Sequence, residues 1–181
     1  MLGDFDNAEI ATAGGTVRFY RRDDAFLVET AGEDGEPTEF AVSHTFGIEP
    51  LQQYLIALDN GRVQALSIAW DSRPASEGGQ QWFDLYPEES IDHRDPLHWT
   101  GTYQRWNTMC ADCHSTNLVK GYDPASATFH TTWSEIDVAC EACHGPGSDH
   151  LAWAQGREPG QPVVAEDDLG LVLDLADDPG V

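Results

Sequence analysis

The sequence predicts an α+β fold, with a small antiparallel β-sheet in the N-terminal half and a loop-rich segment of short helices after it. Apolar and polar residues alternate in short runs over residues 11–71, and turn-forming residues separate these runs. The alternation stops after Arg73-Pro74, and residues 97–154 contain all four cysteines and five of the seven histidines. We therefore predict a β-rich subdomain at 1–73, a connecting loop at 74–96, a functional segment at 97–160 and an acidic linker or tail at 161–181.

Hairpins make up the predicted sheet. Three alternating runs are expected to be consecutive strands: Thr16–Tyr20, Phe26–Thr30 and Thr38–Val42. A further hairpin is expected where Leu55–Leu58 and Arg62–Trp70 flank Asn60-Gly61, because Asn-Gly readily adopts the positive φ angles of a tight turn. In the acidic tail, only residues 170–175 have the apolar character of a short strand.

The chain of 181 residues is strongly acidic, with 32 Asp and Glu against 9 Lys and Arg and a formal net charge of −23. Nucleic acid and anionic membrane surfaces are bound by clustered basic residues, whereas this chain has one lysine, Lys120, so neither is expected as a partner. No apolar run approaches the roughly 20 residues that span a bilayer. The acidic residues are spread along the chain, which favours a solvated surface suited to salt over steering of a cationic partner.

Two copies of the pentapeptide C-x-x-C-H stand in the second half, at Cys110–His114 and Cys140–His144. This spacing is the attachment signal for c-type haem, because two thiols three residues apart lie on one side of a helical turn and the next histidine reaches the iron. The sequence therefore predicts a multihaem cytochrome c segment with two covalently attached haem c groups. The predicted thioether residues are Cys110, Cys113, Cys140 and Cys143, and the predicted proximal iron ligands are His114 and His144.

Other cysteine chemistry fits the two motifs less well. A zinc site would use the same four thiolates but would not need a histidine after each pair. A disulfide within C-x-x-C is more typical of redox-active pairs than of structural bridges. Four tryptophans in this segment are expected to cover porphyrin faces and edges: Trp99, Trp106, Trp133 and Trp153.

The second axial ligand of each iron is expected to be histidine. The only methionines are Met1 and Met109, and Met109 adjoins Cys110 on the proximal side, so bis-histidine ligation is predicted. His98, twelve residues before Cys110, and His150, beyond the turn after the second motif, are the favoured distal ligands. The less favoured candidates are His44 and His130, while His93 is expected to be a surface residue.

Several segments together resemble a family of exported bacterial proteins that join a multihaem cytochrome c domain to tetratricopeptide repeats. They are His44–Gly47, Pro50–Leu55, Gly78–Phe83, Asp95–Gly101, Trp106-Asn107, Ser115–Leu118 and Cys140–Ser148. The haem part of that family is similar to the tetrahaem cytochromes of the ammonia-oxidation pathway. Members usually carry a further C-x-x-C-H upstream and helical repeats downstream, so the resemblance implies that this chain is the dihaem portion only. It also favours His98 and His150 as distal ligands, and it leaves open a distal histidine from the upstream segment or from another subunit.

The predicted function is transfer of single electrons between exported redox partner proteins or adjacent haem modules, without bond chemistry. Thioether attachment requires export, but Met1–Asp6 has no features of a secretory signal, so we expect a removed leader or a longer parent chain in the periplasm or outside the cell. Two alternatives remain open. One is a haem enzyme that reduces a small nitrogen oxide or peroxide at a five-coordinate haem, and the other is a structural subunit that self-associates into a multihaem assembly or filament.

Overall fold

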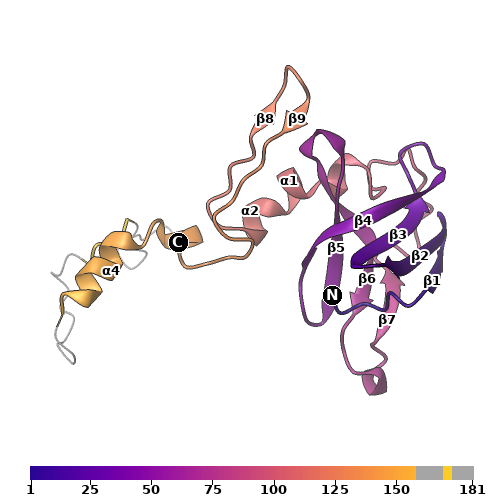
Figure 1. The fold of residues 1–181 in the computed structure, drawn as a ribbon, viewed down its shortest axis with the longest axis horizontal. Coiled ribbons are helices and arrows are strands. Elements are labelled where there is room, and N and C mark those ends of the chain that lie inside the picture. The colour runs from indigo at the N-terminus through magenta and orange to yellow at the C-terminus, as the bar shows by residue number, and fades with distance from the viewer. Residues whose placement is uncertain (158–168, 173–181) are drawn as a thin grey trace. The chain divides into compact units, whose positions relative to one another are not determined.

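The computed structural model describes residues 1–157 and 169–172 (Figure 1). Contacts divide the chain into two units: unit 1 is 1–110 with 120–131, and unit 2 is 111–119 with the described part of 132–181. The subdomain ranges predicted from the sequence stay predictions. Most of the predicted tail at 161–181, including 173–175 of its expected strand, lies outside the described residues. Within the described residues, no helix is both long and apolar enough to cross a membrane.

Unit 1 is built on a seven-stranded antiparallel sheet in which every strand pairs with the next along the chain. The strands are β1 (Ala8–Thr12), β2 (Gly15–Arg22), β3 (Ala25–Ala31), β4 (Pro37–Phe46), β5 (Leu51–Ala57), β6 (Val63–Asp71) and β7 (Gln81–Asp84). The first and last strands also approach each other, so the sheet curls into a nearly closed, barrel-like form. One-turn 3₁₀ helices η1 (Asp59–Gly61) and η2 (Ala75–Glu77) connect β5 to β6 and β6 to β7.

The predicted hairpins are confirmed, and their registers follow from the turns. β2 and β3 pair with Phe19 opposite Val28, and β5 and β6 pair with Ala57 opposite Val63. Asn60 and Gly61, between β5 and β6, have φ angles of 65° and 70°, as expected for an Asn-Gly turn.

The predicted α+β class with a loop-rich, short-helix second half is wrong, because the chain is mostly β. The sheet begins earlier than residue 11 and continues past 71, and β7 lies inside the predicted connecting loop 74–96. Its Trp82 stacks on Phe19 with ring centroids 3.6 Å apart, so a partner far away in the sequence stabilises this strand. In the second half, β8 (Tyr122–Asp123) pairs with β9 (Thr128–Phe129). The helices α1 (Trp106–Met109), α2 (Ala111–His114) and α3 (Glu141–His144) have one turn each.

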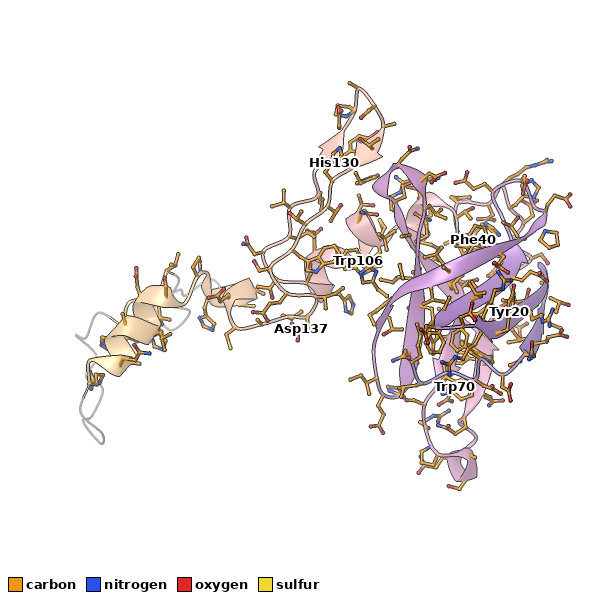
Figure 2. All side chains as sticks on the ribbon, viewed as in Figure 1. Tyr20, Phe40, Trp70, Trp106, His130 and Asp137 are labelled. Carbon is orange, nitrogen blue, oxygen red and sulfur yellow. The ribbon has the colours of Figure 1, made fainter. Side chains whose placement is uncertain are left out.

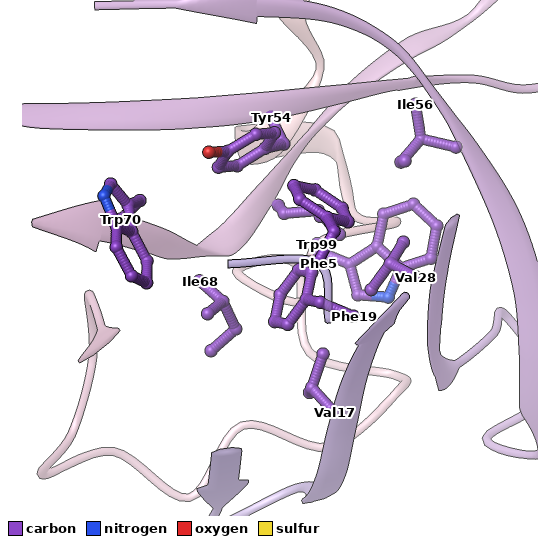
Figure 3. Close-up of a cluster of buried hydrophobic side chains, with 10 residues drawn as sticks. Phe5, Val17, Phe19, Val28, Tyr54, Ile56, Ile68, Trp70 and Trp99 are labelled. Carbon is purple, nitrogen blue, oxygen red and sulfur yellow. The ribbon is translucent and has the colours of Figure 1, made fainter. Parts of the chain in front are cut away.

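A cluster of buried aromatic and aliphatic side chains fills the inside of unit 1 (Figure 3). Phe19 and Tyr54 are fully buried, and Phe5 packs edge-on against both of them at 5.7 and 5.5 Å. Trp99, which follows the sheet by fifteen residues, joins the cluster and donates from Nε1 to the Ala31 carbonyl at 2.7 Å. Unit 1 therefore has a hydrophobic core of its own, to which the segment before the first C-x-x-C-H motif contributes.

Candidate haem-attachment site

The second motif is wound into one helical turn of unit 2. Helix α3 covers Glu141–His144, and Cys140 before it already has helical angles, φ −54° and ψ −36°. The amides of Cys143 and His144 donate to the Cys140 carbonyl at 3.2 and 3.0 Å. Gly145 ends the turn with a φ of 72°, in the left-handed region that favours glycine. The two thiols and the imidazole therefore leave the same helical turn, as attachment to one haem requires.

The first motif lies on an interrupted helical stretch. Helix α1 spans Trp106–Met109 and α2 spans Ala111–His114, with Cys110 between them in a helical conformation (φ −115°, ψ −37°). Buried Ser115 follows α2, and its Oγ donates to the Ala111 carbonyl at 2.6 Å. This bond satisfies a carbonyl at the end of the helix and fixes the turn that carries Cys113 and His114.

The chemistry and exposure of these side chains fit covalent haem. Cys113, Cys140 and Cys143 are exposed and Cys110 is half-buried, and no disulfide joins any of the four, all of which lie in the described residues. The described parts of the chain contain no group of three or more His, Cys, Asp or Glu that could hold a metal ion.

Unit 2 also lacks an apolar core of its own. Among its described residues, Ala111 is the one buried apolar side chain. Five large apolar side chains of the unit are exposed: Val119, Ile136, Val138, Leu151 and Val172. A segment that folds around a large apolar prosthetic group is expected to have exposed apolar side chains of this kind in its polypeptide.

A buried asparagine, for which the sequence analysis predicted no structural role, anchors α1 to the sheet of unit 1. The side chain of Asn107 is fully buried, and its Oδ1 accepts from the Val63 amide at 2.7 Å. Its Nδ2 donates to the Gly61 carbonyl at 3.2 Å and to Thr131 Oγ1 at 2.8 Å. One amide therefore joins α1, the β5–β6 turn and the segment that follows β9.

A buried glutamine fixes the approach to α1. The side chain of Gln64 on β6 is fully buried, and its Nε2 donates to the carbonyls of Trp99 and Gly101 at 2.9 and 2.8 Å. The 3₁₀ helix η3 (Thr102–Gln104) follows directly. With Asn107, this residue holds the chain in place up to Cys110, which is a role that no local pattern in the sequence indicates.

The two favoured distal candidates have their Nδ1 atoms engaged. His98 is 8% exposed in unit 1, with Nδ1 2.8 Å from Thr100 Oγ1. His150 lies on α4 (Ser148–Gln155) in unit 2, with Nδ1 2.7 Å from the Leu169 carbonyl oxygen. In metal-binding histidines the second ring nitrogen commonly makes such a bond, which orients the ring and leaves Nε2 for the metal. Burial lowers the pKa of His98, and the charge of His93 lowers it further, so the neutral imidazole that iron requires is favoured.

The less favoured candidates differ from each other. His44, on β4, is half-buried and has Nδ1 3.1 Å from Ser43 Oγ. His130 follows β9 and is exposed (Figure 2), and it is Nε2 that lies 3.3 Å from Thr128 Oγ1. In His130 the hydrogen bond therefore occupies Nε2, which is the nitrogen that His98 and His150 would use to bind iron.

The tryptophans expected to cover porphyrin fall into two groups. Trp99 and Trp106 are 3% and 1% exposed within unit 1, where they pack in the protein interior. Trp133 and Trp153 in unit 2 are half-buried, and Trp153 stacks on the ring of His150 with centroids 5.2 Å apart. The contact with Trp153 and the Nδ1 bond to the Leu169 carbonyl together orient the imidazole of His150.

Comparison with known proteins points to the same chemistry. Residues 80–145 match the family described as cytochrome c554 and c-prime. No curated protein and no solved structure matches the chain. The matched range includes both C-x-x-C-H motifs together with His98 and His130, and excludes His44 and His150. The match supports a c-type cytochrome, a class of typically exported proteins that carry covalently bound haem c and transfer electrons.

Proposed function

We propose that this chain is an electron-transfer module with two haem c groups, each held by one C-x-x-C-H motif. The observation that carries the proposal is the repeated C-x-x-C-H arrangement, on one helical turn at Cys140–His144 and on an interrupted helical stretch at Cys110–His114, with both motifs inside the matched range. The exposed apolar side chains of unit 2 support it, because two porphyrins would cover such surface.

Each residue has a defined role in this proposal. The four cysteines form the thioethers, and His114 and His144 are the proximal ligands. His98 and His150 are the proposed distal ligands, because a bond at Nδ1 leaves Nε2 for iron in both, and because the family resemblance favours them over His44, which has a similar bond at Nδ1. Haem supplies the one-electron chemistry, and bis-histidine ligation gives it a lower potential than His/Met ligation would.

The electrostatics of the chain indicate the kind of redox partner. A formal net charge of −23, to which haem propionates add, disfavours contact with another acidic surface. We therefore expect a partner protein that is neutral or basic at its docking face, or a neighbouring haem module. The proposed location is the periplasm or the cell exterior, where c-type haem is attached.

Haem content and carbon monoxide binding test this function. Protein matured in a host that attaches haem c is expected to carry two haems, and its reduced low-spin spectrum should not change when carbon monoxide is added, since both irons have two histidine ligands. The paired variants Cys110→Ala with Cys113→Ala, and Cys140→Ala with Cys143→Ala, should each lose one haem. Absence of covalent haem would refute the proposal. A spectrum shifted by carbon monoxide would instead favour the five-coordinate haem enzyme.

Asparagine substitutions test the distal ligands. The side chain of asparagine can keep a hydrogen bond near the position of Nδ1 but has no imidazole for iron, so His98→Asn and His150→Asn should each convert one haem to a high-spin form that binds carbon monoxide. His44→Asn and His130→Asn are the matched controls and should leave both haems low-spin. If the two controls changed the spin state while His98→Asn and His150→Asn did not, the ligand assignment would be reversed.

A further inference from the structure

One buried hydroxyl in unit 2 connects the end of the first motif to the start of the second. Thr116 stands two residues after His114 and is 1% exposed. Its Oγ1 donates to the Asp137 carbonyl at 2.8 Å and accepts from the Ala139 amide at 2.8 Å. Ala139 immediately precedes Cys140, and Asp137 is marked in Figure 2.

The backbone of the same residue pairs with the same segment. The Thr116 amide donates to the Glu135 carbonyl at 2.9 Å, and the Ser134 amide donates to the Thr116 carbonyl at 2.9 Å. A second bridge joins Val119 and Thr132. Thr116 thus makes four hydrogen bonds to residues 134–139, which lead directly into the second motif.

These bonds hold the chain that leads into α3, where buried apolar side chains are scarce among the described residues. Unit 2 has almost no apolar core among its described residues, so hydrogen bonds rather than packing must define the path from α2 to Cys140. The Ala139 carbonyl accepts from the Ala142 amide at 3.0 Å and so begins the turn that carries the second set of thiols. Loss of the Thr116 hydroxyl would therefore affect α3 through Ala139, which bonds to both.

We propose that Thr116 is a positioning residue that sets the placement of the two haem-attachment turns relative to each other, and thereby the electronic contact between the two haems. This inference rests on the proposed function, since it requires haem on both motifs. The residue is neither a proposed iron ligand nor a proposed thioether residue, and it acts through Asp137 and Ala139 on the chain that enters the second motif. Electron exchange between haems depends on their separation, so the proposed module needs such a fixed spacing.

The test compares three variants of the haem-loaded protein. Thr116→Val keeps the shape but loses both Oγ1 bonds, Thr116→Ser keeps the hydroxyl, and Thr132→Val is the control. The Thr132 hydroxyl has no hydrogen-bond partner among the described residues, although its backbone belongs to the same strand pairing. Haem content and the low-spin spectrum of the unsubstituted protein and of each variant are measured first. Absence of haem from the unsubstituted protein would be failure of the proposed function, not of the role of Thr116.

The deciding measurement is the dipolar interaction between the two ferric irons by pulsed electron paramagnetic resonance. Thr116→Val is expected to shift and broaden the distribution of iron–iron distances while each haem keeps its own low-spin signal. Thr116→Ser and Thr132→Val should match the unsubstituted protein. A distribution in Thr116→Val that equals that of the unsubstituted protein would overturn the proposal, as would the same broadening in Thr132→Val.

Amide hydrogen exchange gives a second test, and its first part uses the unsubstituted holoprotein alone. The Ala139 amide should be protected to the same degree as the Val119 amide, which is bonded to the Thr132 carbonyl. In Thr116→Val its exchange should accelerate by about tenfold to a hundredfold, as loss of one buried hydrogen-bond partner predicts. An Ala139 amide that exchanges freely in the unsubstituted protein would overturn the assignment even if Thr116→Val does not mature.

Discussion

Replacing Asn107 with leucine is expected to lower the free energy of unfolding of unit 1 by about 3 kcal/mol, because buried polar partners are left unpaired. Leucine has a similar volume but cannot replace the acceptor for the Val63 amide or the donor to the Gly61 carbonyl. The substitution also removes the bond to Thr131 Oγ1. Urea denaturation followed by far-ultraviolet circular dichroism measures the loss.

Thr131→Val is the matched control for this substitution. It removes one of the three partners of Asn107. The free energy of unfolding should fall by about 1 kcal/mol, which is the usual contribution of a single hydrogen bond. The double variant should cost less than the sum of the two, because the residues share that bond. If Asn107→Leu unfolds at the same urea concentration as the unsubstituted protein, Asn107 does not anchor α1.

The consequence for haem follows from where α1 lies. The Cys110 amide donates to the Trp106 carbonyl at 3.2 Å, so the first thiol continues directly from the helix that Asn107 holds. Loss of the anchor should therefore speed amide exchange in Trp106–Met109 without affecting α3, which belongs to unit 2.

The sequence predicted correctly those features that depend on residues close together in the chain, namely a tight turn and a helical turn. Asn60-Gly61 specified its hairpin because the positive φ angles of that turn are a property of the two residues themselves. The C-x-x-C-H pentapeptides indicated single helical turns, and the backbone around Cys140–His144 forms one. Neither inference needed a residue more than a few positions away.

Features that depend on distant partners were missed. Strand β7 is short and follows Gly78-Gly79, and its place in the sheet depends on the stacking of Trp82 against Phe19, which no short window contains. Because β7 was missed, the size of the sheet was underestimated and the fold class was wrong. Thr116 likewise looks like an ordinary polar residue until its pairing with residues 134–139 is known.

The largest destabilisation is expected for Phe19→Ala, about 4 kcal/mol, since removing a fully buried aromatic side chain leaves a cavity as well as losing apolar burial. Phe19 is fully buried, stacks on Trp82 and packs edge-on against Phe5. A loss of this size is a large fraction of the roughly 5–15 kcal/mol that stabilises a typical domain. Tyr20→Ala is the control, because Tyr20 is the next residue of β2, points to the opposite face and is half-buried beside Glu39. Tyr20→Ala should lower the free energy of unfolding by less than about 1 kcal/mol.

Thermal unfolding of Phe19→Ala also separates the two haems, because thioether bonds survive unfolding whereas axial ligation by a folded residue does not. If His98 is a distal ligand, the haem that it ligates should become high-spin at the lowered melting temperature of the sheet. A haem that does not use His98 should stay low-spin to a higher temperature. The measurement records circular dichroism, which follows unfolding of the sheet, and the visible spectrum, which follows the spin state of each haem, during the same heating experiment. If both low-spin signals are lost at the melting temperature of the sheet, or if neither is lost, His98 is not the distal ligand of one haem alone.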